Sequence, residues 1–132
     1  MLKDSQSFAR FVVWSNAFYL IPLVAAVYVR FWIDALVLAV LIFISALFHL
    51  SRERRFVMLD IAISLCAIFV NAAAVYHGGF KSPYTMVIGV LIGLGLYIRY
   101  VIERGDRGSV AHGWWHLVAS AILTACVLSY VG

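Results

Sequence analysis

Long apolar stretches alternate with short polar ones along the whole chain. Five apolar segments are separated by brief connections that carry charged residues or glycine. Each segment is close to the ~20 residues that a helix needs to cross ~30 Å of hydrocarbon. None shows the period-two alternation of a strand, and a helix satisfies its own backbone groups in lipid. The pattern therefore predicts an all-α, polytopic transmembrane bundle in a single domain, 1–132, with helices over 8–29, 31–50, 56–76, 83–102 and 110–131.

Composition supports a membrane protein and excludes other classes. The chain is 65% hydrophobic and 12% charged, with a mean hydropathy of +1.01, whereas a soluble domain is about half apolar and a quarter charged. The net charge of +4 does not indicate a nucleic-acid partner, because the basic residues stand at the ends of the apolar segments. Cys66 and Cys126 both fall inside apolar segments, which predicts core thiols and no disulfide.

The basic residues are distributed unevenly between the two sides of the predicted membrane. Five crossings place eight of them on the side of the N-terminus and two, Arg30 and Lys81, on the other side. Because basic residues are enriched in cytoplasmic loops, we expect a cytoplasmic N-terminus and an external C-terminus. The eight residues are Lys3, Arg10, Arg52, Arg54, Arg55, Arg99, Arg104 and Arg107.

Three histidines and one carboxylate are expected at similar depth near the cytoplasmic side. His112 and His116 are four residues apart, so they share one face of the last segment and both rings can reach one ion. His49 ends the second segment at the same membrane edge, and Asp60 lies about one turn into the third. By the rise of ~1.5 Å per residue, all four lie within the first two turns of the membrane. His77 falls on the opposite side and cannot join them.

This set of side chains is typical of zinc. Three neutral imidazoles leave a tetrahedral zinc with one open position for water, which is the pattern of catalytic rather than structural sites. Zinc makes that water a nucleophile near neutral pH, and Asp60 is a candidate to take its proton and return it to a leaving group. Ser45 and Ser64, each one turn deeper than His49 and Asp60, are candidates to orient the carboxylate, the water or an oxyanion.

Each of these residues also has an ordinary structural interpretation, which stays open at this point. His49 and Asp60 flank the basic connection 51–55, where Asp60 can pair with an arginine. Membrane serines often bond to a carbonyl of their own helix. On the fourth segment, Gly89 and Gly93 form a small-residue motif, which predicts close packing against a neighbouring helix or a homodimer with a second copy.

Three motifs occur in the order that is typical of the CREST superfamily of membrane hydrolases and receptors, which the chain resembles: Ser45-x-x-x-His49, Asp60-x-x-x-Ser64 and His112-x-x-x-His116. That group includes alkaline ceramidases, adiponectin-type (PAQR) receptors, Per1 lipid-remodelling proteins and myomaker-like proteins. The resemblance implies that the three histidines hold zinc, that Ser45 and Asp60 are associated with the water, and that Ser64 supports them. It covers three helices of five, whereas the family typically has seven. The chain therefore resembles a short, bacterial member located in the inner membrane.

The resulting prediction is a zinc-dependent hydrolase that cleaves an amide or ester bond of a membrane lipid, as a ceramidase does, near the cytoplasmic leaflet. One alternative is a non-enzymatic, zinc-stapled receptor or lipid sensor similar to the PAQR receptors. Asp60 as a direct fourth ligand would favour that role, because structural zinc more often has four protein ligands. A second alternative is a haem protein with two axial histidines.

Overall fold

The computed structural model describes residues 10–51, 53–104 and 110–131, and every regular element within these ranges is helical. Five helices are long and apolar enough to cross a membrane. Their bounds agree with the predicted segments to within two residues, except that the predicted start at Phe8 lies outside the described residues. The first helix, Arg10–Tyr28, contains the 3-10 helix η1 (Asn16–Tyr19) and α2 (Leu20–Tyr28). The second and third are α3 (Trp32–Ser51) and α4 (Arg54–His77). The fourth helix, Tyr84–Ile102, contains α5 (Tyr84–Tyr97) and the π-helical turn η2 (Ile98–Ile102), and the fifth is α6 (Val110–Val131).

The first two helices are separated by a very tight turn. Arg30 adopts the left-handed conformation (φ 61°), and the N–H of Phe31 bonds to the carbonyl of Ala26 at 2.8 Å. This hydrogen bond is typical of a helix C-terminus at which a residue, usually glycine, adopts the left-handed conformation. Gly79 (φ 73°) occupies the equivalent place after α4. The chain thus reverses direction with three residues, 29–31, outside the helices at the first turn and six, 78–83, at the second.

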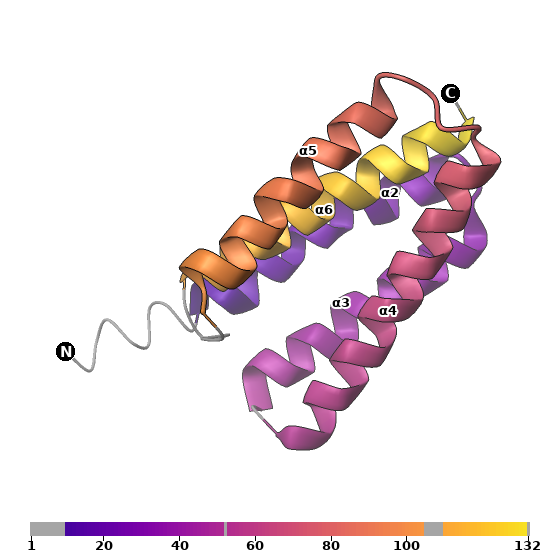
Figure 1. The fold of residues 1–132 in the computed structure, drawn as a ribbon. Helices are drawn as coiled ribbons and strands as arrows, with labels where there is room; N and C mark the ends of the chain where they lie inside the picture. Colours follow the sequence, from indigo (N-terminus) through magenta and orange to yellow (C-terminus); the bar gives the residue numbers. More distant parts are fainter. Residues whose placement is uncertain (1–9, 52, 105–109, 132) are drawn as a thin grey trace.

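α6 lies at the centre of the bundle (Figure 1). It contacts the first helix, α4 and α5, whereas α3 packs against α2 and α4. The main core consists of small, branched and aromatic side chains from four of the helices: Tyr19, Ala26, Ala35, Leu38, Leu41, Ala67, Leu123 and Val127. Large apolar side chains such as Phe43 and Phe69 are 63% and 72% exposed on the outer faces, which suits contact with lipid.

α6 is fastened to the first helix at the point where the backbone hydrogen bonds of that helix are interrupted. Pro22 has no N–H to donate to the carbonyl of Phe18, four residues before it. The hydroxyl of Ser120 on α6 donates to this carbonyl at 2.5 Å. The same carbonyl accepts a backbone N–H at the end of η1, and serine side chains often supplement the backbone bonds near a proline in a membrane helix. The Ser120 hydroxyl is therefore a second donor to this carbonyl, and its hydrogen bond joins α6 to the first helix.

A second polar contact joins α3 to α4 at the end of the bundle where α3 begins. Asn71 donates through Nδ2 to Oδ1 of Asp34 at 2.7 Å, and both side chains are buried. Interhelical hydrogen bonds of this kind stabilise membrane bundles by roughly 0.6–2 kcal/mol. The main core lies between this pair and the opposite end of α3.

Two expectations about helix faces are changed by the structure. Cys126 is a buried thiol as predicted, but Cys66 is exposed, because α4 turns Ala67 rather than Cys66 toward the core; both cysteines are free. Gly89 and Gly93 have open space around them, with no described atom within 4 Å of a Cβ placed there. They do not pack against another helix among the described residues, so the first of the two predicted roles does not apply.

Candidate metal centre

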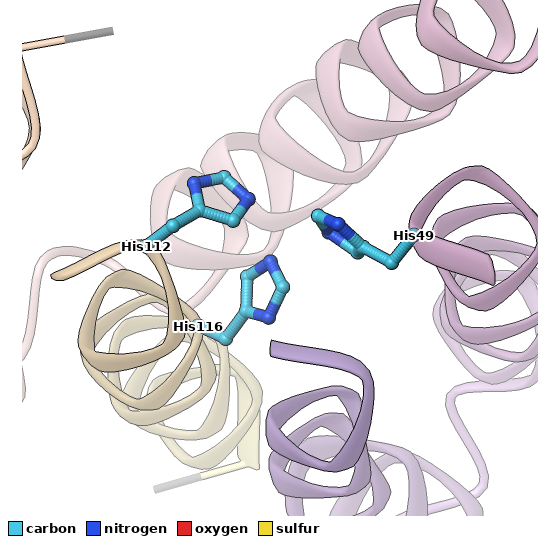
Figure 2. Close-up of side chains that lie close together, drawn as sticks. All are labelled: His49, His112 and His116. Atoms are coloured by element: carbon cyan, nitrogen blue, oxygen red, sulfur yellow. The ribbon is translucent and has the colours of Figure 1, made fainter. Parts of the chain in front are cut away.

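The three predicted histidines meet at one end of the bundle (Figure 2). His49 comes from the last turn of α3, and His112 and His116 come from the first two turns of α6. One ligand atom from each ring lies within 4.8 Å of the other two. His112 and His116 are buried and His49 is partly buried. Two helices that are distant in sequence thus bring the predicted ligand set together.

The arrangement of the rings fits a small ion with nitrogen ligands. The ring centroids are 4.6 Å apart for His112 and His116, 5.1 Å for His49 and His112, and 5.2 Å for His49 and His116, with planes inclined by 60° to 68°. Rings inclined in this way can direct nitrogen atoms at a common centre. Tetrahedral ligands at Zn–N distances of about 2.0–2.1 Å are about 3.4 Å apart. The nitrogen atoms therefore need to close by no more than about 1.4 Å, which small side-chain rotations supply.

Close packing by the first helix positions the beginning of α6. Gly113 lies between the two histidines and is buried, and a Cβ at this position would clash with the ring of Phe11. Tyr19, the last residue of η1, places its ring against His116 with the centroids 5.5 Å apart. A glycine at 113 thus allows the first helix to approach α6, and the approach confines His116 from that side.

Asp60 lies near the cluster but outside the group of ligand atoms. It is partly buried in the second turn of α4, and its carboxylate is not among the atoms that meet within 4.8 Å. Asp60 is close enough to Tyr19 to act on it electrostatically, and Tyr19 contacts His116. The carboxylate is therefore on the cluster's side of the bundle. It is not a fourth member of the group of ligand atoms.

The predicted serines follow their helices as expected. Ser45 is buried, 2% exposed, one turn from His49 along α3. Ser64 is partly buried, one turn from Asp60 along α4. His77 is exposed at the far end of α4, which agrees with its exclusion from the cluster.

Two residues that the sequence patterns did not assign to the site contact the histidines from outside. Ser15 of the first helix has its Oγ 2.7 Å from Nδ1 of His116. Glu103, directly after η2, has its Oε2 3.1 Å from Nδ1 of His112. The other oxygen of Glu103, Oε1, accepts a hydrogen bond from the guanidinium of Arg99, and the glutamate side chain is 0% exposed. The only sequence signal for Glu103 is its place near the same membrane edge as His112.

The π-helical turn η2 explains why Glu103 faces the cluster. The buried positions of α5 are Ile88 and Gly95, seven residues apart, and a regular helix would bury Ile102 next. The N–H of Glu103 instead bonds to the carbonyl of Ile98, five residues back, at 2.8 Å, so the turn holds one extra residue. Ile102 is consequently 54% exposed and Glu103 is 2% exposed. One additional residue turns an isoleucine outward and an ionisable side chain inward.

No family model, no curated protein and no solved structure matches the chain. The resemblance to the CREST superfamily therefore stays a prediction that rests on the spacing of three motifs. Independently of it, the fold has five helices able to cross a membrane and a group of three histidines at one end of the bundle.

Proposed function

We propose that the chain is an integral membrane protein whose three histidines bind one zinc ion, and that it hydrolyses an amide or ester bond of a membrane lipid, as a ceramidase does. The observation that carries the proposal is the convergence of His49, His112 and His116 within 4.8 Å. Three nitrogen ligands are the pattern of catalytic zinc sites, in which one position stays open. When bound, zinc supplies a Lewis acid that activates water near neutral pH.

Asp60 is the residue to which we assign proton transfer. Its carboxylate lies on the cluster's side of the bundle without belonging to the ligand group. A carboxylate in such a place accepts a proton from water and returns it to the leaving amine or alcohol. Ser45, buried one turn from His49, and Ser64, one turn from Asp60, are assigned to orienting the reacting carbonyl or the carboxylate.

The distribution of charge supports a reaction at the cytoplasmic leaflet. Among the described residues, arginines gather at the end of the bundle that carries the histidines, while Arg30 and Lys81 lie at the opposite end. Basic residues are enriched on the cytoplasmic side of membrane proteins. We therefore propose that the histidine end and the N-terminus lie in the cytoplasm, and that the protein is located in a bacterial inner membrane. The arginines concerned are Arg10, Arg54, Arg55, Arg99 and Arg104.

The first experiment measures the metal content of detergent-purified protein prepared without chelator. We expect about one zinc per chain in the wild type and none in a His112→Ala/His116→Ala variant. His77→Ala is the matched control, because His77 is exposed at the other end of α4 and should leave the metal content unchanged. Absence of zinc from a folded wild-type protein contradicts the metal site.

The second experiment tests turnover by the zinc-loaded protein. Ceramides, acyl-amides and phospholipids are presented in mixed micelles, and the release of fatty acid is measured against the double histidine variant. Release that depends on the histidines supports the hydrolase. Zinc binding without release from any of these lipids contradicts the hydrolase and leaves the metal site intact.

A zinc-stapled receptor or lipid sensor is the second candidate, and the distribution of the ligands favours it. His49 lies on α3 and the other two histidines on α6. In the described residues α3 packs mainly against α4 and α2, and α6 packs mainly against α5, α4 and α2, rather than against each other. A metal ion would link α3 to α6 and stabilise the folded state by mass action. Under this candidate, removal of zinc lowers the melting temperature and no lipid is hydrolysed.

A haem protein fits the geometry poorly. Axial histidines bind on opposite faces of a flat macrocycle, whereas the three rings here lie with centroids 4.6 to 5.2 Å apart in one cluster. A Soret band in the absorption spectrum of the purified protein would contradict the zinc proposal.

A further inference from the structure

We propose that Ser15 and Glu103 are positioning residues of the histidine cluster: each holds the Nδ1 atom of one histidine, so that the Nε2 atoms are presented to the metal ion. The inference rests on the proposed zinc site and extends it to two helices that carry no ligand. Figure 2 shows the outer tips of the His112 and His116 rings turned toward His49. The contacts of Ser15 and Glu103 are made on the Nδ1 side of these rings.

The hydrogen bonds of Ser15 determine which nitrogen of His116 carries a proton. The Ser15 hydroxyl has one proton, and its Oγ lies 2.6 Å from the carbonyl of Val12 and 2.7 Å from Nδ1 of His116. A carbonyl can only accept, so the hydroxyl proton goes to Val12. Oγ must then accept the second bond from an Nδ1–H group. His116 is thereby held as the tautomer whose Nε2 has a lone pair to give to a metal.

Glu103 acts in the same way on His112, with a charged acceptor. Oε2 lies 3.1 Å from Nδ1, within hydrogen-bonding distance, although the contact lacks the alignment of a regular hydrogen bond. Hydrogen bonds at functional sites are often poorly aligned until the site binds its ligand. A carboxylate on Nδ1 both fixes the ring orientation and makes the imidazole a stronger ligand.

The burial of Glu103 indicates a role beyond an ordinary ion pair on a helix surface. A carboxylate removed from water is costly unless it is paired and hydrogen-bonded. Arg99 is 24% exposed and could pair with a glutamate on the outer face of the fourth helix, yet the π-helical turn carries Glu103 inward to His112. The side chain is 0% exposed and bridges the guanidinium to the imidazole. The chain thus places a fully desolvated carboxylate where only the histidine gives it a second partner among the described residues.

The closing experiment measures zinc affinity of the full chain in detergent by competition with a chromophoric chelator. We expect Ser15→Ala and Glu103→Gln to weaken zinc binding by roughly 10–100-fold, the usual effect of removing an outer partner of a ligating histidine. Ser15→Thr keeps the hydroxyl and should retain wild-type affinity. The matched controls are Ser129→Ala, a buried serine bonded to the carbonyl of Cys126, and Glu53→Gln, an exposed glutamate paired with Arg55.

Two further readouts separate positioning from loss of fold. The visible spectrum of the Co²⁺-loaded protein should change in Ser15→Ala and Glu103→Gln, because the ligand field depends on ring orientation, while the helical circular dichroism stays constant. In metal-free protein labelled with ¹⁵N-histidine, His116 should appear as the Nδ1–H tautomer, and Ser15→Ala should lose this preference. An Nε2–H tautomer in the wild type overturns the role of Ser15 even if no metal is added.

The outcomes distinguish this inference from the proposed function. Zinc binding that is unchanged in both folded variants overturns the inference and leaves the zinc site standing. Weakened binding in both variants supports it, even when no lipid is turned over and the hydrolase proposal fails. A wild-type protein that binds no zinc overturns both.

Discussion

His112 and His116 share one face of α6 but have different outer partners. His116 meets the neutral hydroxyl of Ser15, and His112 meets the buried carboxylate of Glu103. Hydrogen bonds to a charged acceptor are roughly twice as strong as those between neutral groups. We therefore expect His112 to be the ligand whose orientation depends most on its partner. In the affinity experiment, Glu103→Leu should weaken zinc binding more than Ser15→Ala does, because the leucine removes both the charge and the hydrogen-bond acceptor.

At the same scale, Asp60 separates the catalytic from the structural role of the cluster. Asp60→Asn keeps the size of the side chain but removes the proton acceptor, so we expect turnover to fall by about 10²–10⁴-fold with the zinc content unchanged. Both quantities are measured on the same preparation. Asp34→Asn is the control, because Asp34 is a buried carboxylate bonded to Asn71 at the other end of α3. Loss of zinc from folded Asp60→Asn protein would indicate a ligand instead of a proton carrier.

Among the elements, the histidines lie on regular helices, and the two residues that contact them from outside lie next to irregular turns. The histidines stand on α3 and α6, whereas Ser15 directly precedes the 3-10 helix η1 and Glu103 directly follows the π-helical turn η2. Both kinds of turn change the angle at which later side chains leave the helix. Such turns are frequent at functional sites because they redirect one side chain without breaking the element. In this chain the π-helical turn redirects Glu103 toward the cluster, and Ser15 lies in the residue before the 3-10 helix.

The contact between the first helix and α6 is tested by a double-mutant cycle on Pro22 and Ser120. Ser120→Ala should lower the free energy of unfolding by about 1 kcal/mol, because the Phe18 carbonyl loses its side-chain donor and keeps only a backbone N–H. In the Pro22→Ala background the new N–H can also bond to that carbonyl, so the same change should cost about 0.5 kcal/mol less. Unfolding in mixed micelles gives the four free energies. Additive effects would contradict the assignment, and Ser129→Ala controls for loss of a buried serine.

Among the described residues of the whole molecule, ionisable side chains and the histidines gather at the two ends, and a mainly apolar core that includes the Ser120 hydroxyl separates them. The Asp34–Asn71 hydrogen bond joins α3 to α4 at one end, and the histidine cluster with Glu103 and Ser15 lies at the other. The core between them includes Leu38, Leu41 and Val127. Chemistry confined to one end suits a reaction in one leaflet, since transport would need polar groups through the full thickness of the membrane.

The open glycine face of the fourth helix belongs to the same scale. Because Gly89 and Gly93 pack against nothing within the described chain, we predict that a second copy packs there and forms a homodimer. Gly89→Leu/Gly93→Leu should reduce dimerisation in vesicles, measured by energy transfer between labelled chains. If the motif contributes about 1.4 kcal/mol or more to the free energy of dimerisation, the dimerisation constant should fall at least 10-fold. Ala72→Leu on the exposed face of α4 is the control. Equal energy transfer in all three proteins would show that this face is covered by lipid.

The sequence by itself determined the helices, their order and the histidine face of α6. Each helix satisfies its own backbone, so length and apolar composition were enough to place its ends to within two residues. The i, i+4 spacing puts His112 and His116 on one face whatever the neighbouring helices do. Alternating crossings likewise put His49 at the same end, and the structure brings its ring to the other two.

Only the tertiary structure decided which residues hold those histidines. Ser15 and His116 are 101 positions apart, and their contact depends on how the first helix rotates against α6. Glu103 reaches His112 because η2 contains one residue more than a regular turn, which reverses the faces that helical spacing assigns to Ile102 and Glu103. The rotation of the helices also determines that Cys66 is exposed and that the face at Gly89 is open. Helix formation is local, but rotation and packing are settled between segments, so these features became visible only in the folded bundle.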